Sequence, residues 1–360
     1  MNSALNIFMG KGYTNMDGSV ILNRGPVFPL MIASSYWLLG VSAWTAFWVV
    51  RIFCILNPII IYFFGKRFFG KWVGFSASLL ILTSYGMNFW SYRHIDAVWP
   101  FFTLVSILTI HLALENERYI YFVLSGILMG LAYLVKQAAI LFLPLPLILT
   151  TVIGDYRRKK NLVGSIIFIL TIFAFISPWL DYAYSHGKNI ELALFGEVGR
   201  DESETTVNAD ILVFAKDYLL GLLAYYDKGS NSLSSNFSIA PLFICAWLFT
   251  IYRAIRGEKA SVFFTVFLLL LSPYIAFVGL NNMRVGQLVI FLLITYLVTA
   301  GFCLAIMGKA AAANYGRLRI SRKLIGYATG LVVIGLVVIQ TFISNKKDKG
   351  NKVFFKRSYV

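Results

Sequence analysis

Long runs of apolar residues, separated by short polar stretches, recur along most of this chain. Of its 360 residues, 59% are hydrophobic and 13% are charged, whereas soluble domains are about one quarter charged. Runs of roughly 18 or more apolar residues are long enough for a helix to cross a bilayer. A soluble multi-domain fold is excluded, because the chain has too few polar residues to cover its surface. The sequence therefore predicts an all-α protein, a polytopic bundle of transmembrane helices.

The apolar pattern predicts about 10 to 12 membrane segments. They lie near residues 26–40, 45–64, 72–92, 97–114, 119–135, 137–153, 162–183, 239–252, 261–280, 286–307 and 324–343. The first segment is short enough to be only half-embedded. The two segments that flank Lys136 are short enough to be tilted or re-entrant.

Polar stretches between these segments suggest how the chain is organised. We expect an external N-terminal segment (1–25), a transmembrane core that carries the sequence motifs (26–183), an external loop (184–238), further transmembrane helices (239–343) and a basic tail (344–360). Within the external loop, residues 211–226 have the pattern of an amphipathic helix lying on the membrane.

The net charge of +16 is explained by membrane topology and not by nucleic-acid binding. Lys and Arg gather in short loops near residues 66–71, 157–160, 253–259 and 317–323. Short basic loops stay in the cytoplasm, and no basic face with interleaved aromatic residues is available for nucleic acid. We therefore expect an integral multi-pass protein of the cell (plasma) membrane, surrounded by membrane lipids, whose active site faces outside.

The cluster Arg93-His94-Ile95-Asp96 is the most unusual polar feature, because it lies between two long apolar runs. Ionisable groups at such a place are expensive to bury and usually mark a functional site. A solvated turn between two membrane spans would give the same pattern. An acid on this outer face could act as a base or hold a divalent metal.

Four cations share the predicted outer face, namely Arg24, Arg93, Lys136 and Arg284. Cations around a cavity at membrane level suit an anionic lipid head group such as a phosphate or pyrophosphate. Lys136 is the strongest single candidate for a functional cation, because it lies within a long apolar stretch. A charged side chain there needs an ion-pair or hydrogen-bond partner, or water. The small residues Gly126, Gly130 and Ala132 before it permit close helix contact. Each cation alone could instead extend its side chain to the membrane interface. The prediction of an anion site therefore depends on all four cations lying on the same face.

The cysteines and histidines form no metal-binding pattern. Cys54, Cys245 and Cys303 lie singly within apolar runs, where they are expected to be small core residues. The three histidines are well separated in sequence, so no histidine-based ligand spacing exists. We predict no certain cofactor and no assigned metal ligands, with a divalent metal held by external acids as an alternative.

The order of several short segments resembles a known family. Residues 24–30, Arg-Gly-Pro-Val-Phe-Pro-Leu, resemble a Lys/Arg-Pro-Pro-Leu entry, and residues 130–136, Gly-Leu-Ala-Tyr-Leu-Val-Lys, resemble a Gly-Leu-x-x-Leu-x-Lys segment. Further similar segments are residues 39–51, 62–70, 92–97 and 282–284. Together they resemble the C-type-fold (GT-C) glycosyltransferases that use polyprenyl-phosphate sugars. This family includes dolichyl-phosphate-mannose protein mannosyltransferases and lipid A aminoarabinose transferases.

The resemblance implies a GT-C-like helical bundle and a glycosyl transfer reaction. A sugar would pass from a polyprenyl (dolichyl or undecaprenyl) phosphate donor to a protein, lipid or glycan acceptor at the external membrane face. Arg24, Lys136 or Arg284 would hold the donor phosphate and stabilise it as the leaving group. Asp96 would have a supporting acidic role, and His94 would help to position the acceptor.

The resemblance also implies that the principal catalytic acid lies outside this chain. Residues 4–10, Ala-Leu-Asn-Ile-Phe-Met-Gly, resemble the family stretch that follows that acid, so the acid is expected upstream of Met1. Asp17 is the only acid before the first apolar segment and is a candidate substitute, although a turn residue is the simpler interpretation. The alternatives are a truncated, catalytically inactive paralogue and a flippase or transporter of lipid-linked sugars. A transporter would be expected to show internal repeats, and none is evident.

Overall fold

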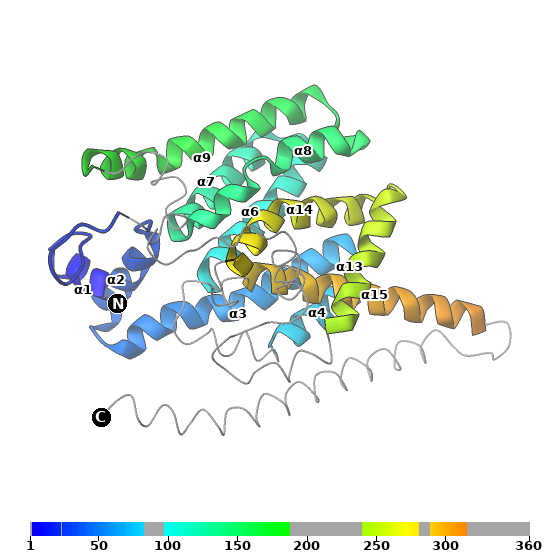
Figure 1. Cartoon of the computed structure of the whole chain (residues 1–360), viewed down its shortest axis with the longest axis horizontal. Helices are drawn as coiled ribbons and strands as arrows, with labels where there is room; N and C mark the ends of the chain where they lie inside the picture. The colour runs from blue at the N-terminus through cyan, green and yellow to red at the C-terminus, as the bar shows by residue number, and fades with distance from the viewer. Residues whose placement is uncertain (1, 23, 83–96, 188–239, 281–288, 315–360) are drawn as a thin grey trace, which may run out of the picture. The chain divides into compact units, whose positions relative to one another are not determined.

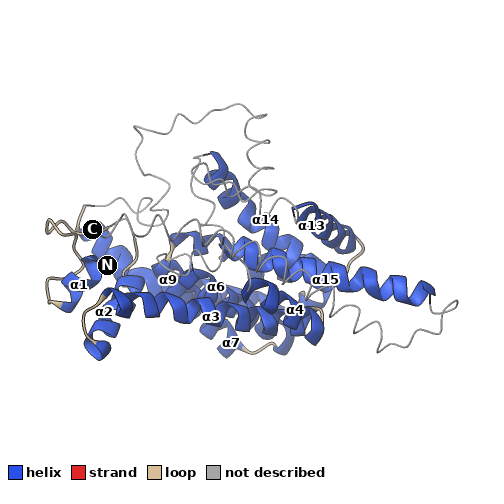
Figure 2. Cartoon of the chain, turned by 90° about the horizontal axis from the view of Figure 1, so that it is seen from below, coloured by secondary structure: helices blue, strands red, loops and turns tan. Residues whose placement is uncertain are grey.

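The regular elements of the described chain are helices. The computed structural model of the protein describes residues 2–22, 24–82, 97–187, 240–280 and 289–314. Within these ranges the only β contact is an isolated antiparallel bridge between Thr14 and Val20, and Figure 2 shows helices joined by loops. The predicted all-α fold class is confirmed.

The helices of the described residues follow one another along the chain in the order of the colours in Figure 1. They are α1 (Asn2–Phe8), α2 (Val27–Leu39), α3 (Ala43–Phe68), α4 (Lys71–Leu82), α6 (Val98–Asn116), α7 (Tyr119–Val135), η2 (Gln137–Phe142), α8 (Leu145–Val152), η3 (Gly154–Tyr156), α9 (Lys159–Ser185), α13 (Ala240–Ile255), α14 (Lys259–Leu280) and α15 (Val289–Asn314). Among the described residues, α3, α6 and α9 are long and apolar enough to cross a membrane. Several shorter apolar helices accompany them, and the predicted segment 324–343 lies outside the described residues.

The chain forms two compact units. The first contains Met1–Asn57, Ser91–Ala209 and Val266–Phe277, and the second contains Pro58–Trp90, Asp210–Thr265 and Val278–Val360. The described candidate site residues Asp17, Arg24 and Lys136 all belong to the first unit.

In the first unit, α6, α7 and α9 pack side by side (Figure 1). Glycines make this possible on α7. A Cβ atom on Gly126 would lie 2.7 Å from the Thr171 side chain, and one on Gly130 would lie 2.8 Å from the Phe175 ring. The close helix contact that the small residues of this segment predicted is confirmed, with α9 as the neighbour.

Glycine contacts also govern packing in the second unit. A Cβ atom on Gly65 would lie 2.2 Å from the Cα atom of Gly74, so α3 and α4 approach each other closely. Phe68 at the end of α3 packs on Phe263 and Phe264 of α14, with ring centroids 4.8 and 5.1 Å away.

Some predicted segment boundaries were wrong. Helix α3 continues to Phe68, through Lys66 and Arg67, which the sequence placed in a loop. The predicted segment 137–153 is divided into η2 and α8. The physical reason is the pair Pro144 and Pro146, because proline lacks the amide donor that a continuous helix needs but is accepted where a helix begins.

Candidate functional site

The turn that precedes α2 packs directly against the C-terminal end of α7. A Cβ atom on Gly25 would lie 2.1 Å from the carbonyl oxygen of Leu134, so only glycine permits this approach. Arg24 precedes Gly25, and Lys136 follows Leu134 by two residues. The structure therefore brings the backbone segments of two predicted phosphate ligands together, although they are far apart in sequence.

Lys136 lies where α7 ends. Its backbone is extended, with φ −149° and ψ 121°, and its amide donates to the Ala132 carbonyl oxygen. The residue is only 7% exposed, and its ammonium lies 5.9 Å from the centre of the Trp99 ring. A cation over an indole ring is stabilised electrostatically. This burial argues against the alternative in which Lys136 simply snorkels to the surface.

Trp99 is held in place by the start of α6. Its side chain is fully buried. The carbonyl oxygen of Ala97, which caps α6, accepts a 2.8 Å hydrogen bond from Nδ2 of the buried Asn57 on α3. The backbone next to Trp99, whose indole lies near the Lys136 ammonium, is therefore hydrogen-bonded to a second long helix.

Arg24 is exposed and lies beside Tyr13. The Tyr13 hydroxyl is 3.2 Å from the Arg24 carbonyl oxygen and 3.3 Å from that of Gly25. Burial raises the pKa of Tyr13, and the nearby Arg24 guanidinium partly opposes this rise. The cation and the phenol are thus close enough to interact electrostatically.

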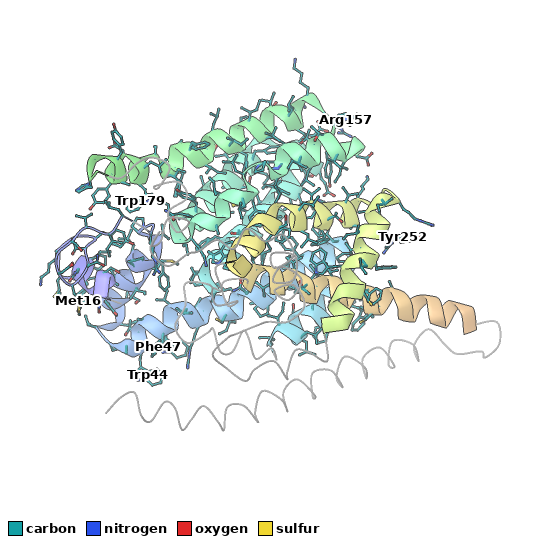
Figure 3. All side chains as sticks on the ribbon, in the orientation of Figure 1. Met16, Trp44, Phe47, Arg157, Trp179 and Tyr252 are labelled. Carbon is teal, nitrogen blue, oxygen red and sulfur yellow. The ribbon has the colours of Figure 1, made fainter. Side chains whose placement is uncertain are left out.

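Aromatic side chains from α9 adjoin Tyr13. The Trp179 ring lies 6.0 Å from the Tyr13 ring and is stacked 5.8 Å from the Tyr182 ring. Tyr182 in turn lies 4.3 Å from the His186 ring. Figure 3 shows Trp179 near the C-terminal end of α9, on the side of the N-terminal segment. The site is therefore built from the N-terminal loop and from the ends of α7 and α9.

Asp17 lies in an exposed turn. Its Oδ1 atom accepts hydrogen bonds from the Ser19 amide at 2.9 Å and from the Ser19 hydroxyl at 2.6 Å. These bonds lower the pKa of the Asp17 carboxyl. This geometry fits the interpretation of Asp17 as a turn residue, because both bonds stabilise the local backbone.

The other predicted site residues, Arg93, His94, Asp96 and Arg284, lie outside the described residues. Within the described ranges, no group of three or more His, Cys, Asp or Glu side chains is placed to hold a metal ion.

The sequence interpretation missed Tyr13, Asn57, Trp99 and Trp179. Trp99 could have been suspected, since it stands three residues after Asp96 at the start of an apolar run. Tyr13 carried no local signal, because its contacts are with residues that only the tertiary structure brings near.

Comparisons with known proteins agree with the predicted resemblance. Residues 23–182 match the family model described as dolichyl-phosphate-mannose-protein mannosyltransferase. This match covers less than half of the chain, and it includes Arg24 and Lys136. No curated protein sequence matches the chain significantly.

Solved structures share the fold. ArnT from Cupriavidus metallidurans in the apo state superposes with a TM-score of 0.60 at 15% identity, over 95% of this chain and 65% of that one. Archaeal oligosaccharyltransferase AglB from Archaeoglobus fulgidus, in complex with an inhibitory peptide and a dolichol-phosphate, superposes with a TM-score of 0.56 at 13% identity, over 91% and 48%. The chain thus spans somewhat less than two thirds of ArnT and about half of AglB. The GT-C-like fold predicted from the sequence motifs is confirmed.

Proposed function

We propose that this chain, which has the GT-C fold of membrane glycosyltransferases, transfers a sugar from a polyprenyl-phosphate donor to an acceptor. The observation that carries the proposal is the packing of Gly25 on Leu134, which places the Arg24 backbone beside the segment that ends in the buried Lys136. Two cations from separate segments, one of them buried, suit a phosphate at membrane depth. The solved structure of AglB is a complex with a dolichol-phosphate, which is a lipid of the proposed class.

At the anomeric carbon, the proposed reaction makes one bond and breaks one. An acceptor oxygen or nitrogen attacks the anomeric carbon of the sugar from the face opposite the phosphate. The bond between that carbon and the phosphate oxygen breaks, and the bonding pair leaves with the polyprenyl phosphate. Negative charge grows on the leaving phosphate, so Lys136 and Arg24 would stabilise the transition state more than the ground state. Arg93 and Arg284 are proposed as further phosphate ligands.

The acceptor hydroxyl or amine loses a proton as it attacks, and we propose that an external acidic side chain takes this proton up. We assign Asp96 a supporting acidic role and His94 a role in orienting the acceptor. The acceptor class is a protein, a lipid or a glycan, and the proposed site faces the outside of the plasma membrane.

Lys136 offers a direct test, because the chain contains a matched control. Lys71, in the second unit, lies 5.7 Å from the Trp72 ring, the same kind of contact as Lys136 with Trp99, but it is exposed. The protein in nanodiscs would be given radiolabelled dolichyl- and undecaprenyl-phosphate sugars. We expect Lys136→Ala to lower the rate of sugar transfer by about 100- to 1000-fold, as for the loss of one group that stabilises a developing anion.

Lys71→Ala should leave that rate unchanged. Lys136→Met keeps the volume of the side chain without the charge, so it separates loss of phosphate binding from loss of folding. Full transfer by a folded Lys136→Met protein would contradict the assigned role. If the wild type moves lipid-linked sugar across the bilayer and transfers none, the flippase alternative is favoured.

A further inference from the structure

Tyr13 takes no part in the chemistry proposed above, yet its hydroxyl contacts the site backbone. The hydroxyl lies 3.2 Å from the Arg24 carbonyl oxygen and 3.3 Å from the Gly25 carbonyl oxygen. A phenol has one proton to donate, so these two carbonyls share it or alternate. Either bond restrains the backbone at the residue that presents a proposed phosphate ligand.

The ring of Tyr13 has a rigid support on α9. Trp179 is only 6% exposed, and its ring meets the Tyr13 ring edge-on, with centroids 6.0 Å apart and planes at 60°. Edge-to-face aromatic contacts are favourable and orient both rings. The direction of the Tyr13 hydroxyl is therefore set by a residue that belongs to a long helix.

The loop that carries Tyr13 is braced from the other side by α1. The side-chain nitrogen Nδ2 of Asn6 lies 3.1 Å from the Thr14 carbonyl oxygen and 3.1 Å from the Thr14 hydroxyl. It also lies 2.8 Å from the Asn15 carbonyl oxygen. Thr14 directly follows Tyr13 and also forms the isolated bridge with Val20. The backbone next to Tyr13 is thus tied to a preceding helix and to the returning half of its own loop.

The Tyr13 hydroxyl remains protonated at neutral pH, so it can donate a hydrogen bond. Burial raises the pKa of Tyr13 despite the neighbouring Arg24 guanidinium. The phenol therefore stays protonated at neutral pH, where it can donate to either carbonyl oxygen.

We propose that Tyr13 is a positioning residue, which holds the Arg24–Gly25 backbone so that the Arg24 guanidinium is presented to the phosphate of the lipid-linked donor. This inference rests on the proposed function, since it takes phosphate binding by Arg24 as its premise. A turn that is not ordered before binding must be ordered on binding, and fixing its backbone dihedral angles then costs free energy. A fixed backbone removes part of that cost in advance, so Tyr13 acts on donor affinity and not on the chemical step.

The test is a double-mutant cycle between Tyr13 and Arg24, with decaprenyl phosphate as the probe and the protein in nanodiscs. Tyr13→Phe keeps the ring on Trp179 and removes only the hydroxyl. We expect it to raise the Kd for decaprenyl phosphate by about 3- to 10-fold, as for one hydrogen bond. Arg24→Ala should raise Kd further. Adding Tyr13→Phe to Arg24→Ala should then change nothing, because the two effects are coupled through one ligand contact.

Two results would overturn the inference. One is an unchanged Kd for Tyr13→Phe, and the other is an effect of Tyr13→Phe that persists in the Arg24→Ala background. Failure of the wild type to bind decaprenyl phosphate would instead reject the proposed function, and the role of Tyr13 with it.

Tyr156→Phe is the matched control. The Tyr156 hydroxyl is 3.1 Å from Nδ1 of the buried His111, so this change also removes one tyrosine hydrogen bond from the first unit. His111 lies about 18 Å along α6 from Trp99, at 1.5 Å per residue. We expect Tyr156→Phe to lower thermal stability and to leave the Kd for decaprenyl phosphate unchanged, which separates positioning from general weakening of the fold.

Discussion

At the scale of single residues, the site combines one buried and one exposed cation. Lys136 is 7% exposed and faces an indole ring, whereas Arg24 is exposed on a turn. Burying an ammonium is costly unless its surroundings compensate. The Trp99 ring is one neighbour that compensates the Lys136 ammonium, and the proposed anionic ligand would be another.

Asp17 can be tested as a catalytic base by an isosteric change. Asp17→Asn keeps the Oδ1 acceptor that bonds Ser19 and removes the carboxylate. If Asp17 is a turn residue, sugar transfer by Asp17→Asn at pH 7 should stay within about 2-fold of wild type, whereas loss of a general base costs about 100-fold or more. Asp17→Ala is the control, because it removes both the charge and the acceptor and should loosen the loop.

The same residue gives a pH prediction. Hydrogen bonds from Ser19 lower the folded-state pKa of Asp17. The ionised Asp17 carboxylate therefore stabilises the folded loop at pH values above the unfolded pKa of about 3.9. That effect is lost only as pH falls through the lower folded value. Protonation of Asp17 should therefore have no effect on the loop between about pH 5 and 8.

At the scale of helices, the site depends on how closely α7 approaches its neighbours. Gly25 meets the end of α7 at Leu134, and Gly126 and Gly130 allow α9 to lie against the same helix. In a membrane, where apolar surface gains little from leaving lipid, such close backbone contact is a main source of helix association. Lys136 lies at the end of α7, so its position depends on the close packing that these glycines allow.

Gly126→Ala tests this packing. An added Cβ would lie 2.7 Å from the Thr171 Cβ and 2.9 Å from the Phe168 carbonyl oxygen. Alanine gains about 1 kcal/mol of helix propensity over glycine, but overpacking costs about 1–3 kcal/mol, and here one neighbour is backbone. We expect a net loss of thermal stability in detergent.

Gly154→Ala is the control, since nothing lies within 4 Å of the added Cβ and no positive φ is involved. Its melting temperature should match that of the wild type. Equal melting temperatures for both variants would mean that α7 and α9 can separate slightly without cost.

At the scale of the whole molecule, the prediction concerns which side of the membrane each end of α9 occupies. This helix has 27 residues, about 40 Å at 1.5 Å per residue, so it can span a bilayer. Arg157 precedes its first turn, and the Tyr13 loop that contains Met16 lies near its other end through Trp179 (Figure 3). Basic residues at the Arg157 end predict that this end lies in the cytoplasm.

Cysteine labelling on intact cells tests this arrangement. Starting from a chain whose natural cysteines are replaced, Met16→Cys and Arg157→Cys each add one thiol at an exposed position. An impermeant maleimide should label Met16→Cys on intact cells and should label Arg157→Cys only after permeabilisation. The reverse pattern would place the candidate site on the cytoplasmic face.

The sequence by itself determined the helical membrane character of the chain, and it predicted the candidate phosphate ligands. Composition and the length of apolar runs are local properties of the sequence. A lysine inside an apolar stretch can likewise be recognised from the sequence without knowledge of the fold. The division of residues 137–153 into two helices was also encoded locally, in Pro144 and Pro146, but the apolar pattern concealed it.

Only the tertiary structure decided which residues meet. The approach of Gly25 to Leu134, the indole of Trp99 beside Lys136 and the contact of Tyr13 with Trp179 all join segments that are distant in sequence. Contacts of this kind follow from helix packing at glycines and from the shape of buried aromatic rings. A linear pattern of hydrophobicity and charge carries no information on either, because it does not specify which helix faces which.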